Sequence, residues 1–156
     1  MPPAASIRID DSLWPLRRVK CVGTVTSQKF EDYLADTVDR LRQGSRFVTI
    51  LDISEGGAPN TEQRQRQAAW FREHETLLRE VHLGVAFIVT SPLIRLALSA
   101  IFYFKPMPSP YFITSQPSEA TLWAISRLQD VGLTFEAERL RCHFGFTSER
   151  TDSPAS

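Results

Sequence analysis

Short apolar runs rich in β-branched residues alternate with stretches of helical periodicity, and this alternation most constrains the fold. Phe47–Ile53 and Gly84–Thr90 have the length and composition of buried strands. Apolar residues at helical spacing occur before, between and after them, at 30–41, 61–81 and 92–104. Strands that alternate with helices in this way are typical of a mostly parallel sheet, because a helix usually makes the crossover between parallel strands.

Weaker signals complete the order of elements. Residues 6–9 and 16–22 alternate weakly and predict a first hairpin, and residues 111–114 predict a last short strand. Residues 117–131 predict a helix, and the apolar residues of 133–144 fit a further helix or a strand. The predicted fold class is therefore α/β, with a mixed, mostly parallel sheet, flanking helices and the order β-β-α-β-α-β-α-β-α.

The chain has the length of one ordinary domain. It contains 156 residues, and we expect one α/β domain over 6–146. Residues 1–5 are predicted to be a loose tail. Residues 147–156 are polar and end in Ser-Pro-Ala-Ser, which predicts a disordered tail.

Charge and hydropathy restrict the partners and the compartment. Basic and acidic residues number 18 each, so no surplus of positive charge indicates nucleic-acid binding. Residues 85–104 are apolar enough to require a membrane test, but Pro92 and Arg95 lie near their middle, which makes membrane insertion an unfavoured interpretation. The first residues lack a basic start followed by an apolar run, which predicts a cytoplasmic location.

The sequence contains none of the common catalytic signatures. It has no Gly-x-Ser-x-Gly elbow, no phosphate-binding Gly-x-x-x-x-Gly-Lys loop and no dinucleotide fingerprint. His74 and His82 lie eight residues apart, which is too far for both imidazoles to reach one ion from a straight helix. We therefore predict a protein that is not an enzyme and that carries no cofactor and no metal.

Two strings resemble a known family. The first is Phe47–Ser54, a central strand that ends in an Asp-x-Ser pattern, and the second is the strand and helix of Gly84–Phe104. Together with the order of elements, they resemble the SpoIIAA-like, or STAS, family, which includes anti-sigma-factor antagonists. The resemblance implies a regulatory domain that acts by binding a partner protein. Antagonists carry a phosphorylated serine at the start of the helix after this strand, and Thr61 is the residue here that could take its place.

The start of the 61–81 helix is a candidate binding site. Projected along the helix, its apolar face continues into polar residues in the first turns, close to where the 47–53 strand ends. Open α/β sheets bind ligands at the carboxyl ends of strands, and free N–H groups at a helix start favour an anion. The alternative function is therefore a small-ligand or anion-binding protein, or a small enzyme, and the competing interpretation is a solvated helix start. The candidate ligand-binding residues are Asp52, Ser54, Thr61, Gln63, Arg66 and Gln67.

The 92–104 helix carries two apolar stripes, although a helix that lies on a sheet needs one. We expect the stripe of Leu93, Leu96, Ala97, Ala100 and Phe104 to face the core. The second stripe then either contacts another protein or a second copy of the chain, or is covered by residues 133–146. The candidate partner interface comprises Ile94, Leu98 and Phe102, with the neighbouring Met107.

Overall fold

In the part of the chain that the structure describes, five strands form a single sheet in sequential order. The computed structural model describes residues 5–146, so the predicted tails lie outside the described residues, apart from Ala5. The strands pair in the order β1-β2-β3-β4-β5; β1 runs antiparallel to β2, and the other neighbours are parallel. This arrangement confirms the predicted fold class. The strands are β1 (Ser6–Leu13), β2 (Leu16–Gly23), β3 (Phe47–Gly56), β4 (His82–Ile88) and β5 (Tyr111–Thr114).

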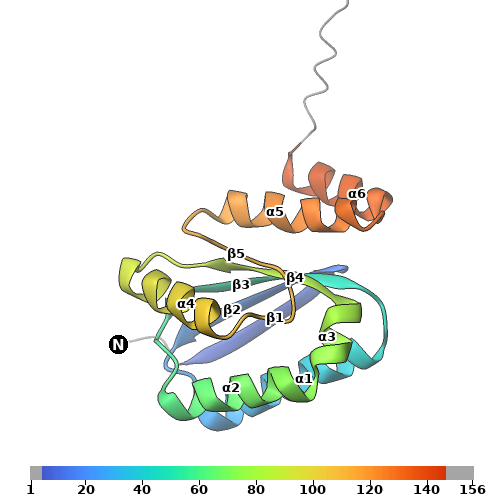
Figure 1. Cartoon of the computed structure of the whole chain (residues 1–156). Helices are drawn as coiled ribbons and strands as arrows, with labels where there is room; N and C mark the ends of the chain where they lie inside the picture. Colours follow the sequence, from blue (N-terminus) through green and yellow to red (C-terminus); the bar gives the residue numbers. More distant parts are fainter. Residues whose placement is uncertain (1–4, 147–156) are drawn as a thin grey trace, which may run out of the picture.

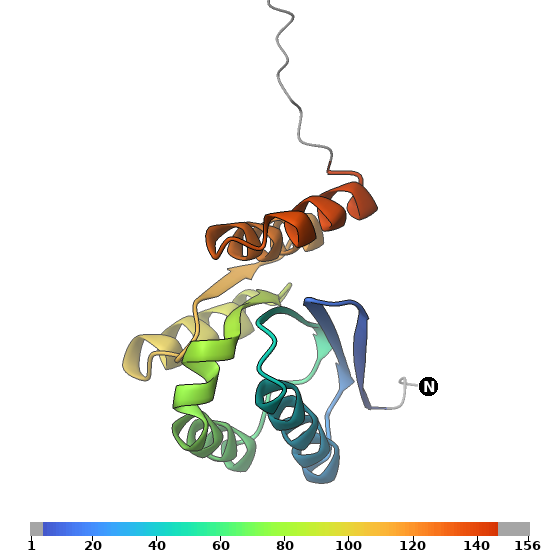
Figure 2. The same cartoon turned by 90° about the vertical axis from the view of Figure 1, so that its right-hand side faces the viewer.

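Helices cover both faces of the sheet. In Figures 1 and 2, α5 and α6 lie on one face, and α1 to α4 lie on the other. The helices are α1 (Ser27–Arg42), α2 (Thr61–Glu73), α3 (Glu75–Val81), α4 (Pro92–Phe104), α5 (Pro117–Asp130) and α6 (Thr134–Phe144). Within residues 5–146 no helix has both the length and the apolar character needed to cross a bilayer, since α4, the most apolar of them, has 13 residues.

The predicted 61–81 helix is divided in two. His74 leaves the helical conformation, with φ −116° and ψ 17°, and separates α2 from α3. The break lets Trp70 of α2 and both Leu78 and Val81 of α3 reach one buried cluster. The expectation of one continuous helix is therefore wrong at its middle, because contacts within this cluster override the local periodicity.

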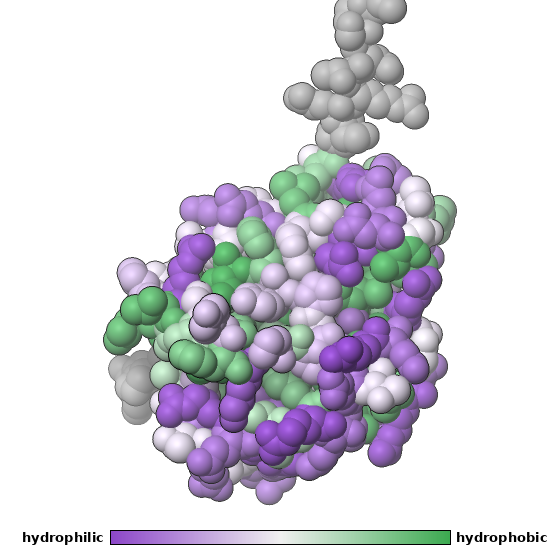
Figure 3. All heavy atoms as spheres, in the orientation of Figure 1, coloured by the Kyte–Doolittle hydropathy of each residue, from purple (hydrophilic) through white to green (hydrophobic). Residues whose placement is uncertain are grey.

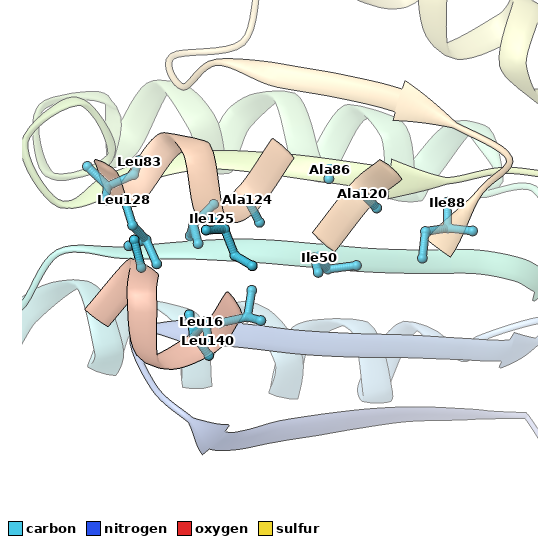
Figure 4. Close-up of a cluster of buried hydrophobic side chains, with 12 residues drawn as sticks. Leu16, Ile50, Leu83, Ala86, Ile88, Ala120, Ala124, Ile125, Leu128 and Leu140 are labelled. Atoms are coloured by element: carbon cyan, nitrogen blue, oxygen red, sulfur yellow. The ribbon is translucent and has the colours of Figure 1, made fainter. Parts of the chain in front are cut away.

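Small side chains bring α5 close to the sheet. Ala120 and Ala124 of α5 are fully buried against strand residues such as Ile50 and Ala86 (Figure 4). Gly84 of β4 has φ +149°, and a Cβ atom there would lie 2.6 Å from the Cη2 atom of Trp123. A glycine is required because the indole occupies the space of a side chain. The sequence allowed a helix or a strand at 133–144; it forms α6, which packs Ala137 and Leu140 into the same core.

The orientation of α4 is opposite to the one expected from its sequence. Phe102 is buried, and Ile94, Leu98 and Met107 pack on the side chains of β4. The side chains expected in the core are in solvent instead, with Leu93 76%, Leu96 67% and Phe104 79% exposed. The prediction that Ile94, Leu98, Phe102 and Met107 form an exposed contact surface is therefore wrong in its structural premise.

Aromatic contacts explain this orientation. The ring of Phe102 lies 5.5 Å from that of Phe87 and 4.6 Å from that of Tyr111, measured between centroids. Such pairs stabilise a helix orientation beyond the apolar area that they bury. Cover of this stripe by residues 133–146 is also excluded, because α6 lies on the other face of the sheet and most of the apolar side chains of 133–146 pack in the core under α5.

Substitutions on the two sides of α4 should have opposite effects. We expect Leu98→Asp to lower the free energy of unfolding by about 2–4 kcal/mol, because a carboxylate would replace an apolar side chain against the sheet. Leu96→Asp should change it by no more than about 0.5 kcal/mol, because Leu96 is in solvent. Urea unfolding followed by circular dichroism measures both values. A larger loss for Leu96→Asp than for Leu98→Asp would show that the helix is turned the other way.

Candidate functional site

Gln63 belongs to the cap of α2. Asn60 precedes the helix, and its side-chain oxygen accepts a hydrogen bond from the Gln63 N–H at 2.7 Å. In return, the Gln63 side-chain oxygen accepts from the Asn60 N–H at 3.1 Å, which completes a capping box. The buried Gln63 amide also donates to the carbonyl of Val25 at 2.8 Å. Gln63 therefore joins the start of α2 to the loop between β2 and α1.

Arg66 links α2 to α1. Its Nε atom donates to a carboxylate oxygen of Glu31 at 2.7 Å, and its Nη1 atom lies 3.5 Å from Glu73. The hydrogen bond to Glu31 raises the pKa of Arg66 above its usual value. Its charge is thus already matched by two carboxylates. Gln67 is half-buried and makes no side-chain hydrogen bond within the described part of the chain.

Asp52 and Ser54 form a separate pair. An oxygen of Asp52 accepts from the Ser54 N–H at 2.9 Å and from its hydroxyl at 2.6 Å. Leu51 and Ile53 pack under α4, so the alternation of the strand directs Asp52 to the opposite face of the sheet. Among residues 5–146, no hydrogen bond or ion pair joins Asp52 or Ser54 to the candidate residues of α2. The six residues therefore do not meet in one crevice.

Thr61 is exposed at the first position of α2. Its hydroxyl oxygen accepts a hydrogen bond from the guanidinium of Arg64 at 3.1 Å. Because β3 and β4 are parallel, the helix starts that follow them lie at one edge of the sheet, and Figure 1 shows the beginnings of α2 and α4 there. A group attached to Thr61 would thus lie at the end of the molecule where α4 begins.

A buried arginine is the site feature that the sequence analysis missed. Arg17 of β2 is 1% exposed and forms ion pairs with Asp36 of α1 and with Asp11. Asp11 also pairs with Arg40 at 3.0 Å, so charges from β1, β2 and α1 are connected. A signal was present in the sequence, because strand alternation puts Arg17 on the same face as Val19, and Val19 is also buried.

His82 lies near this arginine. Its Nε2 atom is 2.9 Å from the hydroxyl of Thr49, and its Nδ1 atom is 3.0 Å from the hydroxyl of Ser109. Burial and the positive charge of Arg17 lower the pKa of His82 from 6.5 to about 4. The imidazole is therefore neutral at neutral pH and acts as a hydrogen-bonding link between β3 and the segment before β5.

The shift at His82 predicts a pH dependence of stability. The unfolded chain takes up this proton near pH 6.5, whereas the folded protein resists it down to about pH 4. The free energy of unfolding should therefore fall as the pH is lowered through this window, with a slope of up to about 1.4 kcal/mol per pH unit from this group. His82→Gln keeps hydrogen-bonding capacity and should lose that part of the slope. Equal slopes for wild type and variant in urea unfolding across the window would contradict this account.

The hollows on the surface of residues 5–146 include one beside the β1–β2 turn and one beside α2. One, of about 510 Å³, lies beside the β1–β2 turn and is lined by residues that include Trp14, Arg46 and Arg139. The other, of about 300 Å³, lies between α2 and the segment after α4, where Phe71 and Lys105 contribute to its lining. The second hollow adjoins the end of α4, whereas the first lies away from the α2 start.

Apolar side chains gather on the outer side of α4. Tyr103 is 80% exposed, which adds to the exposure of Leu93, Leu96 and Phe104. Figure 3 shows apolar residues grouped at this position on the surface. Contiguous apolar surface of this kind is typical of an interaction site. We call Leu93, Leu96, Tyr103 and Phe104 the α4 ridge.

Comparison with known proteins finds similarity in structure. No family model and no curated protein sequence matches the chain. One similar solved structure is an uncharacterized protein of the DUF3478 family with a SpoIIAA-like fold from Shewanella loihica PV-4. The TM-score is 0.61 at 18% identity, over 80% of this chain and 98% of that one. Another is an anti-sigma factor antagonist from Mycobacterium paratuberculosis, with a TM-score of 0.52 at 12% identity and the same two coverages.

Proposed function

We propose that this chain, whose fold is SpoIIAA-like, is a non-enzymatic regulatory domain of the cytoplasm that acts by binding a partner protein. The α4 ridge is the observation that carries the proposal. A large apolar side chain left in water forgoes roughly 1.5–3 kcal/mol relative to burial, so a partner that covers the ridge gains this stabilisation. The similarity in fold to the anti-sigma factor antagonist from Mycobacterium paratuberculosis supports a regulatory role. The free thiols of Cys21 and Cys142 fit a reducing compartment.

The candidate anion site at the α2 start has less support. Its two most specific side chains are already engaged, Gln63 by the cap and Arg66 by Glu31. Asp52 and Ser54 bond to each other. A ligand would have to replace these contacts, and each is a hydrogen bond whose loss leaves a polar group unpaired.

The proposal is tested by capturing partners on tagged protein. We expect wild type to retain a protein that Leu96→Asp does not, because a carboxylate on the ridge disfavours an apolar interface. Phe135→Asp is the matched control, since Phe135 is 77% exposed on α6, on the other face of the sheet. Crosslinking and mass spectrometry identify the retained proteins. The same set on all three baits, or none on wild type, would refute the role of the ridge.

We further propose that phosphorylation of Thr61 regulates this binding. Thr61 is exposed at a helix start, where an anion is stabilised, and Arg64 already contacts its hydroxyl. A phosphate there would gain new charge-assisted hydrogen bonds and would place negative charge at the edge of the sheet where α4 begins.

A charge at Thr61 should change partner affinity. We expect Thr61→Glu to alter the affinity of the captured partner by about fivefold or more, and Thr61→Ala to leave it near the wild-type value. Thr134→Glu, at the first position of α6, controls for a new charge at a helix start elsewhere. Titration of the partner measures all three affinities. Mass spectrometry of the native protein under varied growth conditions should find Thr61 modified, and its consistent absence would remove the switch.

A further inference from the structure

The α4 ridge has the shape of a docking site for a helix. Leu93 and Leu96 lie at one end of the helix and Tyr103 and Phe104 at the other, and the exposed Ala97 and Ala100 lie between them. Small residues between large ones leave a shallow depression, and side-chain ridges of a second helix pack into such grooves. The length of α4, 13 residues, corresponds to about 20 Å, enough for several turns of a partner helix.

The charged residues of α4 and of the position that follows it are all positive. Arg95 lies within α4 and Lys105 directly follows it, and α4 contains no acidic residue. Across the 300 Å³ hollow, Arg72 is a third cation. Among residues 5–146, none of the three forms an ion pair with a carboxylate. Glu75, the acidic residue that lines this hollow, is engaged by Arg79 at 2.6 Å. The complementary surface is therefore both apolar and acidic.

The same charges disfavour a second copy of this chain as the occupant. Two ridges packed together would bring both copies of Arg95 and Lys105 into one interface, and neither α4 would supply a carboxylate.

The shape of the 300 Å³ hollow favours a protein over a lipid surface as the molecule that covers the ridge. The hollow is a concave space at the end of the ridge, near Phe71 and Pro106, and a projecting side chain fills such a space where a flat bilayer does not.

We propose that the α4 ridge docks an amphipathic helix of a partner protein, one whose apolar side carries residues at helical spacing and whose flanks carry Asp or Glu. The proposal rests on the proposed partner-binding function and names the chemistry of that partner. Apolar side chains of the partner cover the ridge, and its carboxylates pair with Arg95, Lys105 and Arg72. Four large side chains make a small interface, at the low end of the range for protein complexes, so the contact is transient.

Fluorescence anisotropy with synthetic peptides tests the chemistry. The probes are a labelled amphipathic peptide of about five helical turns with Leu on one side and Glu on the others, and the same peptide with Lys in place of Glu. We expect wild type to bind the acidic peptide roughly tenfold more tightly than the basic one. Leu96→Asp should lose this binding, and Phe135→Asp should keep it.

Charge reversal separates charge pairing from apolar contact. Arg95→Glu combined with Lys105→Glu should lower affinity for the acidic peptide by about tenfold and raise affinity for the basic one. Arg42→Glu with Arg46→Glu, an equal charge change at exposed arginines near the start of β3, should have little effect. Equal binding of both peptides, or an equal loss in the control pair, would overturn the proposal.

Two further measurements address the other occupants. Sedimentation that shows a wild-type dimer abolished by Leu96→Asp, or binding to phosphatidylglycerol vesicles in place of the acidic peptide, would also overturn the proposal. If Leu96→Asp still loses a captured protein partner while the acidic peptide does not bind, the partner-binding function stands and the acidic helix is wrong. If no partner depends on Leu96, the function itself fails.

Discussion

The buried guanidinium of Arg17 is the constraint around which one face of the protein is organised. A charge that is 1% exposed is tolerated only with partners, and here Asp36 and Asp11 supply them. Asp36 is on α1, so the pairing fixes that helix over β2. The same charge helps to keep His82 neutral, because an imidazolium nearby would repel it. Ion pairing and the placement of α1 thus depend on one side chain, which also adds to the larger effect of burial on the pKa of His82.

The helices on the two faces of the sheet bury different numbers of residues. Under α5, alanines and the Gly84–Trp123 contact bring helix and sheet close, and α5 buries five of its residues. On the opposite face, side chains of α1, α2 and α3 gather around Phe47 of β3. Next to them, α4 packs against β3, β4 and β5 with a single row of side chains. Phe102 is the one buried residue of α4. The outer row of a helix that is apolar on both sides then faces solvent, which is how this fold creates the α4 ridge.

Much of the fold could be predicted from the sequence, because strand and helix periods differ and the two alternate along the chain. What could not be predicted depends on contacts between distant residues. Both stripes of α4 are apolar, so periodicity alone does not predict which of them faces the sheet. The orientation follows from the contacts of Phe102 with Phe87 and Tyr111. The break at His74 likewise follows from packing around Trp70. At the candidate site, the pattern from Asn60 to Gln63 indicates a capping box, which engages the Gln63 side chain without a ligand. The alternation along β3 showed that Asp52 and Leu51 face opposite sides.

The shallow attachment of α4 has a consequence for the dynamics of the chain. Opening of a local segment requires less free energy where fewer side chains are buried, and α4 buries one residue where α5 buries five. Amide protons of α4 are therefore expected to exchange with solvent before those of α5, through a local opening that leaves the sheet intact. A protein that binds the outer row would slow that exchange at a distance from its own contacts, since it would hold the whole helix down. Binding of a protein to the α4 ridge would then slow hydrogen exchange of backbone N–H groups on the inner side of α4.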